Sequence, residues 1–173
     1  MTTKNTKLFG GALSCALPDF FVDGSRFRDV PDHQELFVDT TELGRSLIIE
    51  IVDAEVTISN SAAGDYFIRD YVQATDGTLV SIDKVETSSR NDLISSSQQP
   101  VNFVLAAGSF HASRIGQTTQ DNVTIAMCIY RLHQYHSEII MTLNAPLASL
   151  EDSWRLLSAI SSSLQVLDTT LFT

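Results

Sequence analysis

The chain has 173 residues, 43% of them hydrophobic, and a formal net charge of −10 at pH 7. This composition supports a single folded domain over residues 1–173 and excludes wholesale disorder. The acidic excess and the scattered Lys and Arg residues argue against a nucleic-acid-binding protein, which needs a basic surface.

No apolar run approaches the roughly 20 residues of a membrane span. The polar start, MTTKNTK, lacks the apolar core of a signal peptide. We therefore expect no membrane insertion and a cytosolic or nuclear protein. In such a protein Cys15 and Cys128, each in an apolar context, are expected to be buried, reduced thiols.

The first part of the chain is predicted to contain three strands and a long polar segment. Residues 8–17 are small and apolar, and Gly10-Gly11 indicates a tight turn into a strand. Residues 36–38 form a short strand candidate, and the β-branched run 46–53 is a stronger one. Residues 17–37, which follow the first strand candidate, show no helical or strand period long enough to explain the segment.

A helix, a strand and a loop are predicted next. Apolar residues recur at helical spacing across residues 59–74, and Ser59 or Asn60 can cap the helix start. Residues 78–85 alternate as a strand does. Residues 87–99 are polar and rich in serine, which is typical of a loop.

The last part of the chain predicts an antiparallel meander and a second helix. Residues 101–115, 122–133 and 138–147 alternate apolar and polar side chains, with residues 116–121 and 134–137 as connecting turns.

Residues 150–164 carry one apolar stripe, and Ser149 can cap that helix. The order of elements predicts an α+β fold, in which a mostly antiparallel sheet is flanked by helices.

Half of the net charge is concentrated between residues 19 and 42. There, seven carboxylates stand against two arginines, a difference of −5 out of −10. Such a field is suited to docking a basic partner, because complementary charge steers encounter and selects partners. The seven acidic residues are Asp19, Asp23, Asp29, Asp32, Glu35, Asp39 and Glu42.

Catalytic chemistry has one candidate, the run Asp32-His33-Gln34-Glu35. Two carboxylates beside an imidazole suit acid–base chemistry if they are buried together. Pro31 and the surrounding charges instead indicate an exposed turn, so we predict no catalytic site.

Metal and cofactor sites are not expected either, because His133 and His136 lack ligand partners at suitable spacing. Arg131 lies inside an apolar strand and should therefore be paired with a buried carboxylate.

Several motifs together are similar to those of the Mog family, the Ran guanine nucleotide release factors. The similarity spans nearly the whole chain and is most specific in its first block. That block contains Leu8-Phe9-Gly10-Gly11-Ala12, then Pro18, then Asp23-x-Ser25-x-x-Arg28-x-Val30-Pro31-Asp32-x-Gln34-Glu35-Leu36-Phe37.

The resemblance implies an α/β/α sandwich similar to the PsbP photosystem proteins. It also implies binding to the GTPase Ran, release of Ran's nucleotide, and support of nuclear import. Nothing in the sequence demands more than a monomer, and the small size of the chain allows it to be found in both nucleus and cytoplasm. Accessory Ran-binding proteins stay an open partner class. By the same resemblance, the residues expected to bind Ran are Asp23, Arg28, Asp32, Gln34 and Glu35.

Two other functions stay open from sequence. One is a non-catalytic trafficking adaptor. The other, less favoured, is an acid–base enzyme that uses Asp32, His33 and Glu35.

Overall fold

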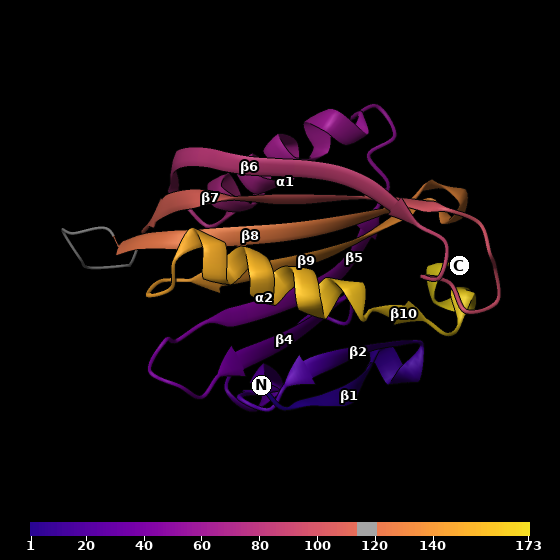
Figure 1. Cartoon of the computed structure of the whole chain (residues 1–173), viewed down its shortest axis with the longest axis horizontal. Helices are drawn as coiled ribbons and strands as arrows, with labels where there is room; N and C mark the ends of the chain where they lie inside the picture. Colours follow the sequence, from indigo (N-terminus) through magenta and orange to yellow (C-terminus); the bar gives the residue numbers. More distant parts are fainter. Residues whose placement is uncertain (114–120) are drawn as a thin grey trace.

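The computed structural model describes residues 1–113 and 121–173, and within them one large sheet dominates (Figure 1). Its strand order is β3-β4-β5-β9-β8-β7-β6, and neighbouring strands are antiparallel. A smaller sheet has the order β1-β2-β10. The expected α+β sandwich is thereby confirmed.

The strands are β1 (Thr3–Leu8), β2 (Leu13–Pro18), β3 (Phe21–Asp23), β4 (Gln34–Asp39), β5 (Ser46–Asp53), β6 (Thr78–Arg90), β7 (Val101–Ala112), β8 (Asp121–Leu132), β9 (Ser137–Ala145) and β10 (Gln165–Val166). The helices are α1 (Asn60–Ala74) and α2 (Leu150–Ser162). Neither of these helices is long and apolar enough to cross a membrane, and no other described helix is.

The two faces of the large sheet are covered by different elements. Helix α2 and the small sheet lie on one face, where they enclose the main core (Figure 1). Helix α1 lies on the other face and packs chiefly on β6, β7 and β8. The β4 and β5 side of that second face is therefore less covered by helix than the β6 to β8 side.

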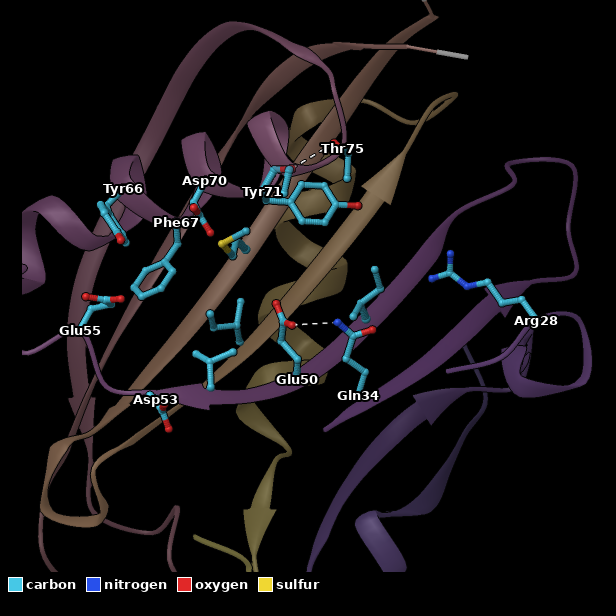
Figure 2. A pocket seen from close by; sticks show the side chains of 15 residues that line it. Arg28, Gln34, Glu50, Asp53, Glu55, Tyr66, Phe67, Asp70, Tyr71 and Thr75 are labelled. Atoms are coloured by element: carbon cyan, nitrogen blue, oxygen red, sulfur yellow. Dashed lines mark hydrogen bonds between the residues drawn. The ribbon is translucent and has the colours of Figure 1, made fainter. Parts of the chain in front are cut away.

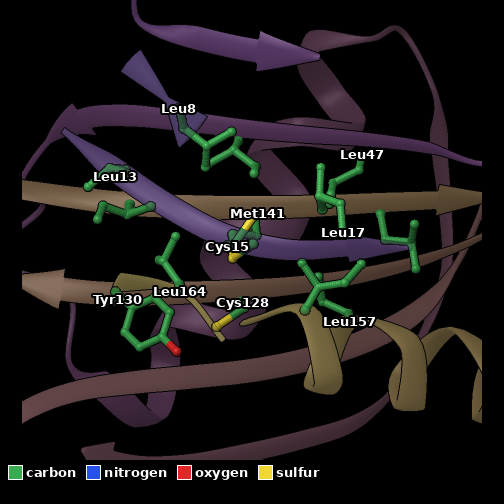
Figure 3. Packing of buried hydrophobic residues seen from close by; sticks show 14 of the residues in the cluster. Leu8, Leu13, Cys15, Leu17, Leu47, Cys128, Tyr130, Met141, Leu157 and Leu164 are labelled. Carbon is green, nitrogen blue, oxygen red and sulfur yellow. The ribbon is translucent and has the colours of Figure 1, made fainter. Parts of the chain in front are cut away.

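The main core joins the small sheet, the large sheet and α2 (Figure 3). Leu17 of β2, Leu47 of β5 and Leu157 of α2 are at most 1% exposed and belong to the same cluster. Cys15 and Cys128 are both buried free thiols, as expected, and burial raises the pKa of each to about 12. Both cysteines therefore act as small apolar core residues.

Strand β1 was not predicted from sequence, because the side chains of Thr3–Leu8 are mostly polar and exposed. It pairs with β2 as a hairpin whose turn contains the 3-10 segment Phe9–Gly11. Gly10 adopts a left-handed φ of 68°, a conformation that favours glycine. The tight turn expected at Gly10-Gly11 is confirmed, and the strand that it leads into, β2, begins at Leu13.

The expected loop over residues 87–99 is partly wrong. Residues 87–90 continue β6 and pair with β7, because backbone pairing does not require apolar side chains there. Further on, Leu93 and Ile94 are at most 2% exposed and join the main core. The final residues of the strand expected over 101–115 and most of the turn expected over 116–121 lie outside the described residues.

Both helices begin where their serines predicted. The Ser59 side chain accepts the Ala62 N–H at 3.3 Å, and the Ser149 side chain accepts the Asp152 N–H at 3.1 Å. These bonds satisfy N–H groups that have no partner inside the first helical turn. Sequence periodicity and capping therefore located both helices, although α2 ends at Ser162, before the predicted residue 164.

Arg131 of β8 forms the predicted buried ion pair, and its partner is Glu138 of β9. The two side chains are 2% and 0% exposed. Arg131 also donates to the carbonyl oxygens of Glu55 at 2.9 Å and Ile58 at 2.8 Å. One buried guanidinium therefore ties the large sheet to the segment that leads into α1.

Replacing Arg131 with Met should lower the free energy of unfolding by about 3–5 kcal/mol, because the buried Glu138 carboxylate would lose its arginine and keep only the partly exposed His133 imidazole, 3.2 Å away. Urea denaturation measures the loss. Arg69→Met is the control, because the Arg69–Asp65 pair is 60% and 54% exposed. That variant should change stability by less than about 1 kcal/mol. Equal losses in both variants would contradict the structural role of Arg131.

Candidate functional site

A groove of about 560 Å³ lies on the α1 side of the large sheet (Figure 2). Its floor is aliphatic and includes Ile48 of β5 and Ile140 of β9. Helix α1 forms one wall with Tyr66, Phe67, Asp70 and Tyr71, and at the other side stand Gln34 and Arg28. The groove occupies the part of this face that α1 leaves open.

Strand alternation explains how polar groups reach this floor. Successive side chains of β5 point to opposite faces, so Leu47 and Ile49 enter the main core while Ile48 and Glu50 face the groove. Glu50 accepts a hydrogen bond from Gln34 Nε2 at 3.0 Å.

On the opposite wall, the Tyr71 hydroxyl accepts a hydrogen bond from Asn144 Nδ2 at 2.7 Å. Its ring also packs edge-on against Phe110, with ring centroids 6.3 Å apart. Tyr71 is therefore held in place before any ligand binds.

The groove is electrically negative. Glu50, Asp53, Glu55 and Asp70 line it against one cation, Arg28. Among the described residues none of these five side chains takes part in an ion pair.

The pKa values of the two groove tyrosines are both raised, for partly different reasons. The Glu55 carboxylate raises the pKa of Tyr66 above its ordinary value, and Asp70 adds to the effect. Burial raises the pKa of Tyr71, where Glu50 also contributes and Arg28 opposes. With four carboxylates against one arginine in its lining, the groove favours a cation over an anion.

The five residues expected to bind Ran do not line one pocket. Gln34 and Glu35 are neighbours on β4, so their side chains point to opposite faces of the sheet. Gln34 and Arg28 line the groove, whereas Glu35 and Asp23 line a smaller pocket of about 240 Å³. That smaller pocket also contains Lys4, Lys7 and Arg26, so its carboxylates are surrounded by positive charge.

Glu35 has a structural partner. Its carboxylate accepts the backbone N–H of Phe9 at 2.7 Å, and Phe9 has a positive φ of 51°. The side chain is only partly exposed. Glu35 therefore stabilises the turn between β1 and β2, whatever else it contacts.

Asp23 and Asp32 lie at the two ends of the β3–β4 loop, residues 24–33. Asp23 accepts the Ser25 N–H at 2.9 Å, a bond that lowers the pKa of Asp23. Asp32 is exposed and, in the part of the chain described, pairs with no arginine. Asp32 is thus the predicted carboxylate that is displayed most freely.

Sequence reasoning missed an aromatic residue of this loop. Phe27 is 71% exposed, and aromatic side chains are enriched at protein contact sites. Its position between Arg26 and Arg28 hid it among charged residues. The acidic field of residues 19–42 also needs correction at Asp39, whose buried side chain pairs with Arg45 at 2.6 Å.

The geometry does not assemble the acid–base cluster. Asp32 and His33 are exposed, and Glu35 is bonded to the Phe9 N–H, so the three groups are not buried together. Within residues 1–113 and 121–173, no group of three His, Cys, Asp or Glu side chains is placed to hold a metal ion.

Comparison with known proteins gives a consistent family. The sequence model described as "Ran-interacting Mog1 protein" matches residues 6–146. The Ran guanine nucleotide release factor of Homo sapiens is 30% identical over 144 residues, covering 83% of this chain and 76% of the human protein. The nuclear import protein MOG1 of Saccharomyces cerevisiae is 24% identical over 197 residues, covering 99% of this chain and 86% of the yeast protein.

Solved structures show the same fold. The crystal structure of the Saccharomyces cerevisiae Ran-binding protein Mog1p superposes with a TM-score of 0.73 at 23% identity and covers 100% of both chains. The solution structure of the cyanobacterial PsbP protein CyanoP from Synechocystis gives a TM-score of 0.62 at 10% identity, over 95% of this chain and 92% of that one. The PsbP-like architecture expected from sequence is thereby confirmed.

The structural role of Glu35 at the β1–β2 turn can be tested on the isolated protein, without Ran. Glu35→Ala should destabilise the protein by about 1–3 kcal/mol and speed amide exchange at Phe9, because that N–H loses its charged acceptor. Glu35→Gln keeps an acceptor oxygen and should lose less. Asp32→Ala, at an exposed position, should stay within about 0.5 kcal/mol of the wild type. Unchanged exchange at Phe9 in Glu35→Ala would show that the bond does not stabilise the turn.

Proposed function

Because this chain belongs to the Ran-interacting Mog1 family, we propose that it binds the small GTPase Ran and promotes release of Ran's guanine nucleotide. In this role it supports nuclear protein import and acts as a monomer in both nucleus and cytoplasm. It works as a regulator and needs no covalent chemistry of its own.

The observation that supports this proposal best is the exposed β3–β4 loop. It carries the most specific family-like motif of the chain and displays Asp32, Phe27 and Arg28 to solvent. Gly24 anchors the loop, because a Cβ atom there would lie 2.5 Å from the Leu36 side chain. An aromatic anchor beside exposed charges is a common composition of protein–protein contact sites.

Nucleotide release requires only differential binding. A partner that binds nucleotide-free GTPase more tightly than the loaded form shifts the equilibrium toward release. GTPases hold their nucleotide through a P-loop lysine and a bridging Mg²⁺. Asp32 is suited to compete for one of these cations, since it is exposed and has no ion-pair partner within the described residues. In the alternative mechanism, Asp32 only docks Ran and another surface of the chain remodels the switch loops.

Two other functions have less support. A trafficking adaptor would use the same exposed loop but would leave nucleotide exchange on Ran unchanged. An acid–base enzyme would need Asp32, His33 and Glu35 buried together, which the geometry does not provide.

The direct experiment follows release of a fluorescent guanine nucleotide from loaded Ran with and without this chain. The proposed function predicts that stoichiometric chain accelerates release and that Ran co-purifies with the tagged protein. Co-purification should weaken as salt rises, because screening reduces the attraction between exposed charges. Binding without any acceleration would favour the adaptor instead.

Mutations can separate the contribution of the Asp32 charge to Ran binding from that of the Phe27 side chain on the β3–β4 loop. Asp32→Asn and Phe27→Ala should each weaken Ran binding by about 1–3 kcal/mol if these side chains are desolvated at the interface. Isothermal titration calorimetry measures the loss. Glu86→Gln, an exposed carboxylate on the edge strand β6, is the matched control and should bind as the wild type does. Unchanged affinity in a folded Asp32→Asn, Phe27→Ala double variant would remove the loop from the Ran-binding surface.

A further inference from the structure

The groove beside α1 has a shape and lining that the proposed docking loop does not explain. Its floor is aliphatic, its wall carries two tyrosines, and its polar lining is mostly carboxylate (Figure 2). A long basic side chain matches this combination, because its stem is apolar and its head is cationic.

Among basic side chains, arginine fits best. Its planar guanidinium stacks on aromatic rings and presents five donors, so one head can bind several acceptors. Glu50 on the floor and Asp70 on the α1 wall offer acceptor oxygens, and Tyr66 and Tyr71 offer rings on the same wall. A lysine head has neither the plane nor the forked donors.

The carboxylates of the groove lack internal compensation. Within the described residues Glu50, Asp53, Glu55 and Asp70 form no ion pair, whereas the buried acids Asp39 and Glu138 are each paired with an arginine of this chain. An incoming cation would therefore find acceptors that no cation of this chain already holds.

We propose that the groove receives an arginine side chain of Ran while the β3–β4 loop holds the rest of the contact. The site rests on the proposed function for the identity of the partner. It is continuous with the docking loop, because Arg28 of the loop and Gln34 at its end line the groove. A partner seated on the loop therefore reaches the groove without a separate binding event.

The first test uses small probes on the full chain. Nα-acetyl-arginine amide should give saturable NMR shifts at Tyr66 and Tyr71. Nα-acetyl-citrulline amide, the neutral analogue, should bind at least about fivefold more weakly, because it lacks the charge that the carboxylates select. Absence of saturable shifts, or equal shifts with both probes, would overturn the assignment of a cationic head.

The second test removes the negative charge of two groove carboxylates while keeping the shape of their side chains. The Glu50→Gln, Asp70→Asn double variant should lose the response to the arginine probe and bind Ran about tenfold more weakly than the wild type, as desolvated charged contacts do. Asp65→Asn on the same helix is the matched control, since Asp65 lies outside the groove in an exposed pair with Arg69. The control should leave both measurements unchanged, and an equal loss in it would contradict a specific site.

The Ran measurement also separates the two proposals. If the wild type binds Ran and the folded double variant binds it equally well, the groove assignment fails while the proposed function stands. If the wild type does not bind Ran at all, the proposed function fails and takes with it the partner assigned to the groove.

Discussion

The architecture depends on unequal coverage of a sheet whose side chains must alternate. One face is closed by α2 and the small sheet, so the residues that β5 and β9 turn toward it are almost wholly apolar. The other face is covered by α1 mainly over β6, β7 and β8. On its open part, β5 presents Ile48, Glu50 and Val52 to the groove, and β9 presents Ile140. Alternation and partial coverage together make a groove in which a carboxylate stands on an apolar floor.

Arg131 contributes both to the stability of the sheet and to the position of α1. Its pair with Glu138 joins β8 to β9, and its donors also hold the Glu55 and Ile58 carbonyls just before α1. Burying this charge costs desolvation energy, which the Glu138 carboxylate and the two carbonyl oxygens offset. The same contacts fix where α1 starts, and therefore where Tyr66 and Asp70 stand. A buried ion pair on one side of the sheet thus sets the position of the groove wall.

The β3–β4 loop joins the proposed docking surface to the groove. Asp23 caps its start, Gly24 packs against Leu36, and strand β4 begins at its far end. These constraints leave Phe27 and Asp32 exposed and direct Arg28 and Gln34 to the groove. Glu35, the next residue along β4, is turned away to hold the β1–β2 turn. The residues of a motif that is continuous in sequence therefore lie on two faces of the sheet, and Glu35 has a structural role at the β1–β2 turn.

The sequence by itself determined the helices, the meander and the α+β class, because helical period, strand alternation and serine caps are local signals. Its motifs also located the loop that carries Asp32, and the apolar setting of Arg131 predicted a buried partner. Only the tertiary structure decided that β1 pairs despite polar side chains, that Leu93 and Ile94 enter the core, and that Gln34 and Glu35 face opposite ways. The lining of the groove also depends on the tertiary structure, because Glu50, Asp70 and Arg28 come from separate elements. Strand pairing and helix packing bring these elements together. No local pattern encodes that proximity.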